Sequence, residues 1–149
     1  MTIASIVQTF TSFIPGLRLI DGGDLLAMAN QLMSAKSGIV AHSGGTQAAA
    51  TPLIANFNSV DTVAADNDSV MLPPAIPGVD VNIYNNSAHT LAVFGVPSNP
   101  NSATGAGDTI AAHNSNAQQP TATGVTQATT LTATYVCYTA GQWKQTLSA

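Results

Sequence analysis

The sequence predicts an all-β protein: a single jelly-roll-type β-sandwich with an N-terminal arm and one short helix. Only 7% of its 149 residues are charged, and all seven acidic residues are Asp, so strong helix formers are scarce. After Gly44-Gly45 the chain is rich in Thr, Val, Asn and Ala, with turn residues about every ten positions. Short runs in this part alternate apolar and polar side chains, as strands with one buried face do. A chain of this length can bury one core without disulfide support.

Residues 1–23 are expected to form an N-terminal arm and entry segment. Apolar residues recur there at spacings that approximate one helical face: Ile3, Ile6, Val7, Phe10 and Phe13 or Ile14. This pattern predicts a short amphipathic arm that ends at Pro15-Gly16. The alternative is that the segment forms the first layer of the domain core, because little in it is charged.

Residues 24–38 are predicted to form the one short helix. Asp24 is its expected N-cap, because a carboxylate accepts hydrogen bonds from the free amides of the first helical turn. Apolar residues follow at helical spacing: Leu25, Met28, Ala29, Leu32 and Met33. Gly38 is expected to end the helix.

Residues 39–149 are expected to form the β-sandwich. The candidate strands are 47–57, 62–64, 69–72, 79–85, 90–96, 108–111, 123–126, 131–138 and 142–147. In the clearest of them Val81 and Ile83 share one face while Asp80 and Asn82 share the other. The polar turn at 85–89 predicts that the strands on either side of it pair as a hairpin.

Composition argues against several classes of function. The net charge is −4 and only three residues are Lys or Arg, too few to neutralise the several phosphates that nucleic-acid binding requires. No apolar run reaches the roughly 18 residues of a membrane span. We therefore expect neither nucleic acid nor a membrane as a partner. The single Cys137 excludes an intrachain disulfide and is expected to be a buried, small apolar residue.

No residue pattern predicts catalysis, a metal ion or a cofactor. His42, His89 and His113 are spaced too widely for a metal-binding motif. The glycine loops at 21–24 and 105–108 lack the Lys-Ser or Lys-Thr of a phosphate-binding loop. Both loops are predicted to be turns that need a positive φ.

Asp61, Asp66 and Asp68 invite comparison with a calcium site, because hard cations prefer several carboxylate oxygens. The EF-hand pattern fails, since Val70 stands at the third ligand position and no Glu follows it. The preferred interpretation is turn chemistry, in which these side chains satisfy local amides.

The aromatic residues leave two possibilities open. Tyr135 and Cys137 are expected on one face of their strand and Tyr138 on the other, with Trp143 closing the sandwich. Alternatively, Tyr84, Tyr138 and Trp143 are exposed together and stack on sugar rings.

Three segments share a recurring arrangement of short strands and turns. The main segment, residues 65–95, has a short strand ending in Leu-Pro-Pro, a Pro-Gly turn, an alternating strand, a polar turn and a Thr-Leu-x-Val-Phe strand. Residues 134–143 extend the likeness, and residues 17–26 are similar to the entry segment that precedes such a module. Together these segments resemble β-modules in structural proteins of tailed bacteriophages. Within this family the chain looks most like a capsid cement or decoration protein.

The resemblance implies a non-enzymatic protein that binds the outer surface of the head shell and stabilises contacts between capsomers. Its implied partners are the major capsid protein and other copies of itself, as a dimer or trimer. It would be made in the host cytoplasm and lie on the capsid exterior of the virion. Hydrophobic exposure points to five interface residues: Phe10, Phe13, Ile14, Leu17 and Arg18. The alternative is a tail or fibre component whose β-sandwich binds a glycan or receptor.

Overall fold

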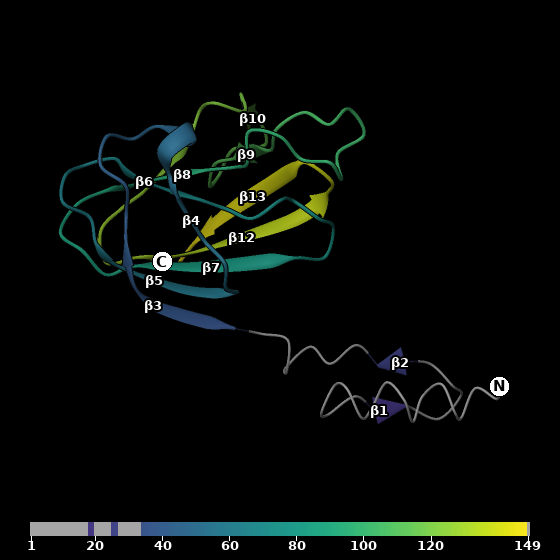
Figure 1. Cartoon of the computed structure of the whole chain (residues 1–149), viewed down its shortest axis with the longest axis horizontal. Coiled ribbons are helices and arrows are strands. Elements are labelled where there is room, and N and C mark those ends of the chain that lie inside the picture. Colours follow the sequence, from purple (N-terminus) through teal and green to yellow (C-terminus); the bar gives the residue numbers. More distant parts are fainter. Residues whose placement is uncertain (1–17, 20–24, 27–33, 149) are drawn as a thin grey trace. The chain divides into compact units, whose positions relative to one another are not determined.

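The computed structural model describes residues 18–19, 25–26 and 34–148 (Figure 1). Backbone contacts divide the chain into two compact units, residues 1–34 and residues 35–149. In the first unit, β1 (Arg18–Leu19) and β2 (Leu25–Leu26) pair as short antiparallel strands. The predicted arm up to residue 17 lies outside the described residues.

The predicted helix over residues 24–38 is wrong at both of its described ends. Leu25–Leu26 form β2, and β3 (Ala35–Val40) is the first strand of a large sheet, while residues 27–33 lie outside the described residues. Gly38 has a φ of 71°, as expected of a glycine that ends a helix, but it lies at an irregularity within β3. Its N–H donates to the Asp61 carboxylate at 2.6 Å. That partner is distant in sequence, so local spacing does not reveal it.

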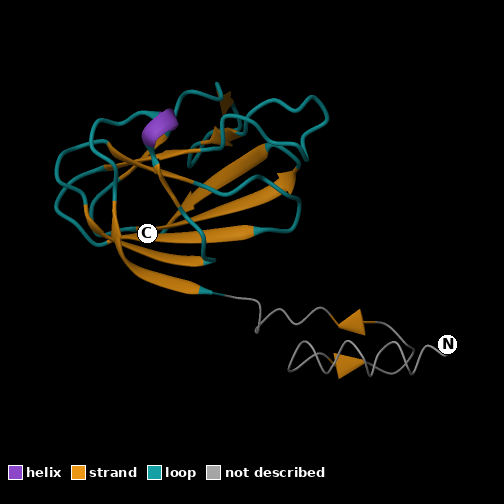
Figure 2. Cartoon of the chain, viewed as in Figure 1, coloured by secondary structure: helices purple, strands orange, loops and turns teal. Residues whose placement is uncertain are grey.

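The second unit contains two β-sheets that pack face to face, together with one 3-10 helix, η1 (Gln47–Ala49) (Figure 2). The larger sheet has the order β10-β9-β13-β12-β7-β5-β3, and the smaller sheet the order β11-β8-β6-β4. The remaining strands are β4 (Thr51–Pro52), β5 (Phe57–Thr62), β6 (Asp68–Met71), β7 (Asp80–Asn85), β8 (Leu91–Phe94), β9 (Thr109–Ala111), β10 (Gln118–Gln119), β11 (Val125–Gln127), β12 (Thr132–Thr139) and β13 (Gln142–Leu147). The described part of the chain is thus mostly β, as the sequence predicts.

From β3 to β8 the chain crosses from one sheet to the other at every step. β3, β5 and β7 are successive neighbours in the seven-stranded sheet, and β4, β6 and β8 are successive neighbours in the four-stranded sheet. All four of these pairings are parallel. The chain therefore winds around the core, and each turn adds one strand to each sheet (Figure 1). A jelly roll consists of antiparallel strands, so this winding does not confirm the jelly-roll arrangement.

The predicted hairpin between residues 79–85 and 90–96 is wrong. β7 pairs with β5 and β12 in the large sheet, whereas β8 pairs with β6 and β11 in the small sheet. Asn85 holds the turn between them: its buried side-chain amide donates to the carbonyls of His89 at 2.9 Å and Ala128 at 3.2 Å. The polar turn carries the chain around the core and not back alongside β7.

The predicted strands 47–57 and 62–64 also differ from the structure. Residues 47–57 contain η1 and the two-residue β4, and β5 begins at Phe57 and ends at Thr62. Pro52 lacks an N–H and lies on an edge strand, where no hydrogen bond is lost. The inward position of Asn58 in β5 places a polar residue where an apolar one is expected, which hides the alternation of this strand.

The strands after β8 extend both sheets at the end formed by β7 and β8, and none of them is added beside β3 or β4. β12 pairs with β7, β13 with β12, and β9 with β13, so that they continue the large sheet beyond β7. β11 pairs with β8 and continues the small sheet. As a result, β3 and β4 remain the outermost strands of the two sheets at the other side.

One hydrophobic core fills the space between the sheets. Tyr135, Cys137 and Trp143 from the large sheet are buried against residues of the small sheet such as Leu91 and Val93. The predicted burial of Cys137 and Trp143 is confirmed. Tyr138, on the other face of its strand, is 76% exposed, as the alternation predicts.

The outer face of the small sheet has its own cover. Ala92 and Phe94 on that face are buried together with Ala50, which follows η1. The Gln47 side chain holds η1 over the sheet by donating to the carbonyls of Gly95 at 2.8 Å and Thr121 at 2.9 Å. No described segment covers the outer face of the large sheet in the same way, since Phe57 and Tyr84 remain exposed there.

Candidate functional site

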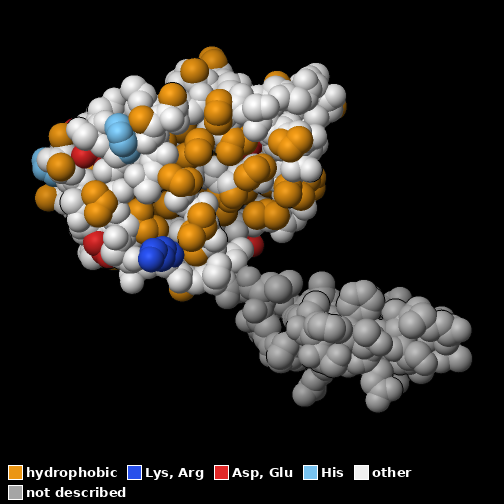
Figure 3. Space-filling model, viewed as in Figure 1, with side chains coloured by type: hydrophobic (Ala, Val, Ile, Leu, Met, Phe, Trp, Pro, Cys, Tyr) orange, Lys and Arg blue, Asp and Glu red, His pale blue; other side chains and the backbone are white. Residues whose placement is uncertain are grey.

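The first turn of the winding, residues 35–56, combines exposed apolar side chains with very little charge. Both outermost strands, β3 and β4, belong to it, and the Thr51 hydroxyl joins them by donating to the Val40 carbonyl at 2.8 Å. Val40 and Ile54 expose 58% and 80% of their surface. Lys36 is the only Lys, Arg, Asp or Glu in these residues. Figure 3 shows hydrophobic side chains across the middle of this view, where Figure 1 places β4 and the connection from β6 to β7.

The outer strand β3 is poorly suited to pairing with a further strand. The irregularity at Gly38 interrupts its register with β5, and the Gly38 N–H is occupied by Asp61. Lys36 adds a charge to the same strand. Bulges and charges of this kind protect sheet edges from extension by another chain. A partner at this end would therefore be contacted through side chains.

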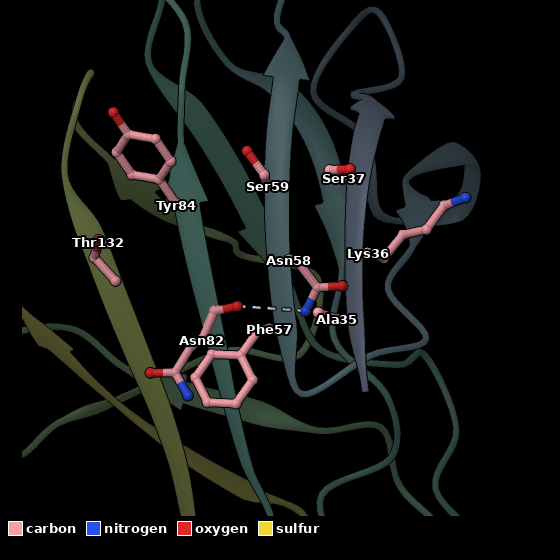
Figure 4. Close-up of a pocket in the computed structure, with 9 residues that line it drawn as sticks. All are labelled: Ala35, Lys36, Ser37, Phe57, Asn58, Ser59, Asn82, Tyr84 and Thr132. Atoms are coloured by element: carbon pink, nitrogen blue, oxygen red, sulfur yellow. Dashed lines mark hydrogen bonds between the residues drawn. The ribbon is translucent and has the colours of Figure 1, made fainter. Parts of the chain in front are cut away.

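A shallow groove of about 410 Å³ lies on the uncovered face of the large sheet (Figure 4). It crosses β3, β5, β7 and β12, and the side chains along it are those that alternation turns outward from these strands: Ser37, Phe57, Ser59, Asn82, Tyr84 and Thr132. Phe57 and Tyr84 expose 45% and 40% of their surface. Figure 4 shows their rings set apart along β5 and β7.

Hydrogen bonds within the sheet hold the floor of the groove. Asn82 accepts from the Thr134 hydroxyl at 2.7 Å and donates to Asp80 at 3.2 Å, so its side chain is fixed. The Ser59 hydroxyl donates to Asp61 at 2.6 Å. By contrast, the hydroxyls of Ser37, Tyr84 and Thr132 form no hydrogen bond with any described residue.

The predicted interface residues cannot be placed on either surface. Phe10, Phe13, Ile14 and Leu17 lie outside the described residues. Arg18 contributes its backbone to β1, and its side chain is not described.

The three histidines lie in separate surroundings. His42 forms a backbone bridge with Ser69, His89 lies 3.4 Å from the Asp66 carboxylate, and the His113 ring accepts from the Leu147 N–H. Within residues 34–148, no group of three or more His, Cys, Asp or Glu side chains is placed to hold a metal ion.

The acidic cluster is bound by the chain's own N–H groups and hydroxyls. Asp68 is buried and accepts from the N–H groups of Ala64, Ala65 and Gly44 at 2.9, 3.1 and 3.2 Å. Burial raises the pKa of Asp68, but these three bonds lower it by more, so its pKa is below the ordinary value. Asp66 similarly accepts from the Thr90 N–H and hydroxyl. This arrangement supports the turn interpretation.

The glycine loop at 105–108 also serves the fold. Gly105 has a φ of 66°, which confirms the predicted positive φ at this loop. Asp108 is buried and accepts from the Ala75 N–H and the Asn99 side-chain amide, both at 2.7 Å. Its carboxylate thus ties the loop to the corner before β7. The corresponding loop at 21–24 lies outside the described residues.

Burial removes Cys137 and Trp143 from any surface site. Burial is the main cause that raises the pKa of the Cys137 thiol, which keeps it protonated at neutral pH. The proposed cluster of Tyr84, Tyr138 and Trp143 for sugar stacking is therefore wrong in its third member. Sequence reasoning missed that Phe57 and Tyr84 lie near each other on one face, because this depends on two distant strands pairing in parallel.

No helix among the described residues is long and apolar enough to span a membrane. No family model, curated protein or solved structure matches this chain.

Proposed function

We propose that this chain is a non-enzymatic decoration protein of a phage head, which binds the outer surface of the shell and stabilises contacts between capsomers. The observation that carries the proposal is the first turn of the winding. It exposes Val40 and Ile54, it contains one charged residue and it includes the outermost strand of each sheet. Exposed apolar surface of this kind is typical of protein contacts.

Several features of the second unit suit a role in a shell. The unit has one continuous core and a winding in which neighbouring turns are hydrogen-bonded in both sheets. Buried Asp68 and Asp108 fix its corners, so its surfaces are held in a constant arrangement. A pre-formed surface loses little conformational freedom on binding, which favours repeated identical contacts in a symmetric shell.

The first experiment measures the number of copies in purified particles by quantitative mass spectrometry against the major capsid protein. Copy numbers close to that of the capsid protein support the decoration role, because a symmetric shell alone offers that many equivalent sites. A few copies per particle would favour a tail or fibre component, and absence from particles would overturn the virion assignment.

A second experiment tests the first turn directly on shells that lack the protein. Ile54→Asp adds a charge to the most exposed apolar side chain of this surface and is expected to abolish binding while the fold is kept. The matched control is Tyr138→Asp, at a 76% exposed position of β12 that lies outside residues 35–56. Equal binding by both variants would contradict a contact through the first turn.

The contribution of the arm is tested by deleting residues 1–16. Residues 35–149 form a compact unit with its own core, so the shortened chain is expected to fold. We expect it to lose shell binding if the arm is part of the contact. Normal binding would assign the contact to the first turn alone.

A tail or fibre component is the second candidate function. The observation that favours it is the groove with its two exposed aromatic rings, which the shell contact does not need. The copy number separates the two candidates.

A further inference from the structure

The groove on the large sheet has the geometry of a small ligand site. In the parallel pairing of β5 and β7, Phe57 lies beside Asn82, and Ser59 lies beside Tyr84. The two aromatic residues are therefore diagonal neighbours on one face. Two residues along a strand and one strand across separate their Cβ atoms by roughly 8 Å. A flat ring of modest size fits between them and contacts both.

The polar groups around this space include hydroxyls that no described residue binds. The Tyr84, Ser37 and Thr132 hydroxyls lie along the groove without a partner among the described residues. Each of them can both donate and accept. A ligand that carries many hydroxyl groups satisfies this set, whereas a purely apolar ligand does not.

The charges near the groove disfavour an anionic ligand. Lys36 lies at its rim, but Asp61 and Asp80 flank Ser59 and Asn82 on the same face. Hydrogen bonds from Ser59, Asn86 and Gly38 lower the pKa of Asp61, so it is ionised at neutral pH. The local balance is one positive charge against two negative charges. A neutral ligand avoids repulsion from these carboxylates.

A peptide is disfavoured for a different reason. Extended peptides bind to sheets by pairing with the backbone of an exposed edge. The floor of the groove is formed by β5, β7 and β12, whose backbone groups pair with neighbouring strands on both sides. No row of free backbone groups lies between Phe57 and Tyr84.

From these observations we infer that the groove binds a sugar ring of a neutral oligosaccharide. The apolar C–H face of the ring packs against Phe57 and Tyr84. Its hydroxyls bond to the side chains of Tyr84, Ser37 and Thr132. The site shares Ser37 of β3 with the first turn, but it does not include Val40 or Ile54 and so does not depend on the proposed shell contact.

The test titrates the isotope-labelled full chain with neutral oligosaccharides and follows the aromatic NMR signals. The probes are hexamers of an α-glucan, a β-glucan, a β-mannan and β-linked N-acetylglucosamine. A hexamer of galacturonic acid and a proline-rich peptide represent the anionic and peptide classes. We expect at least one neutral probe to shift the Phe57 and Tyr84 signals in a saturable manner, with the Tyr138 signals unchanged.

Variants separate ring stacking from a general effect on the fold. Phe57→Ala and Tyr84→Ala are expected to weaken binding at least tenfold, and Tyr84→Phe to weaken it less, because the ring remains and only the hydroxyl is lost. Tyr138→Ala is the control, since this tyrosine is exposed on β12 and does not line the groove. If an alanine variant fails to fold, Ser37→Ala and Tyr84→Phe still test the hydroxyls.

Three results would overturn the inference. The first is no shift of the two rings with any neutral probe at about 10 mM, which exceeds the dissociation constant of a weak site. The second is binding of the anionic hexamer or of the peptide when none of the neutral probes binds. The third is equal loss of binding in Tyr138→Ala. If the protein binds shells but no sugar, only the sugar site is overturned. If it binds sugar but no shells, only the decoration proposal is overturned.

Discussion

The outer faces of the two sheets carry similar residues but differ in their cover. On the small sheet, η1 and the segment at Thr121 close over Phe94, which is only 5% exposed. On the large sheet, Phe57 and Tyr84 remain about half exposed. The difference shows that an aromatic residue on a sheet face does not by itself mark the core. The chain's own cover decides whether the ring stabilises the fold or is available to a partner.

The cover depends on few contacts. The Gln47 side chain bridges two carbonyls that are far apart in sequence, and Ala50 fills the space beside Phe94. The large sheet has no equivalent of Gln47 among the described residues, and its outward side chains Thr134, Asn82 and Asp80 bond to one another within the sheet. Substitutions on the two faces should therefore have different consequences.

The largest expected effect comes from truncating the aromatic ring on each face. Phe94→Ala removes a buried ring and is expected to lower the free energy of unfolding by about 3 kcal/mol. Phe57→Ala removes a half-exposed ring and is expected to cost less than about 1 kcal/mol. Urea unfolding of both variants measures the difference. Equal losses would mean that the face of the large sheet is covered in solution.

A smaller effect is expected when the cover itself is loosened. Gln47→Ala removes both bridging hydrogen bonds and is expected to cost about 1–2 kcal/mol, because two carbonyls lose their donor. Binding of a hydrophobic dye should increase as Ala92 and Phe94 become accessible. Gln142→Ala, at an exposed position of β13, is the control and should change neither quantity. An unchanged dye signal in Gln47→Ala would argue against η1 as the cover.

Local sequence signals predicted much of the packing of single strands. Alternation placed Val81, Ile83, Tyr135 and Cys137 inward, and the expected burial of Trp143 is confirmed. These signals work because each side chain of a strand faces one of only two sides. They also located the turns, since Asn, Gly and Asp have specific backbone preferences.

Local signals did not predict correctly how the strands pair. They also predicted a helix over residues 24–38 that the described residues do not form. The turn after β7 contains typical hairpin residues, yet Asn85 bonds to Ala128 and directs the chain to the other sheet. Gly38 has the backbone of a helix end, but its partner is Asp61. The groove has the same origin, because Phe57 and Tyr84 become neighbours only through parallel pairing. Such long-range contacts leave no periodic pattern in the sequence.

The free energy of unfolding is expected to fall modestly in acid because of Asp68, which holds the segment leading to η1. Asp68 accepts from the Gly44 N–H at the start of the segment that reaches η1, and its pKa is lowered in the folded state. Its stabilisation is thus fully present above the unfolded pKa of about 4 and is lost as the pH falls through the lower folded pKa. Asp68→Asn should flatten this decline when unfolding is measured from about pH 6 to pH 2. Exposed Asp61 is the control, and Asp61→Asn should change the profile less.

The smallest expected effect is that of salt on shell binding. The uncovered first turn has Lys36 as its only charged residue, so an apolar contact through Val40 and Ile54 has little charge attraction to be screened. Raising the salt concentration from about 0.05 to 0.5 M should therefore leave the affinity for shells within a factor of two. Co-sedimentation of the protein with shells at both concentrations measures this. A strong loss of affinity at high salt would mean that charged residues outside the first turn form the contact. Val40 and Ile54 would then be exposed for a different partner.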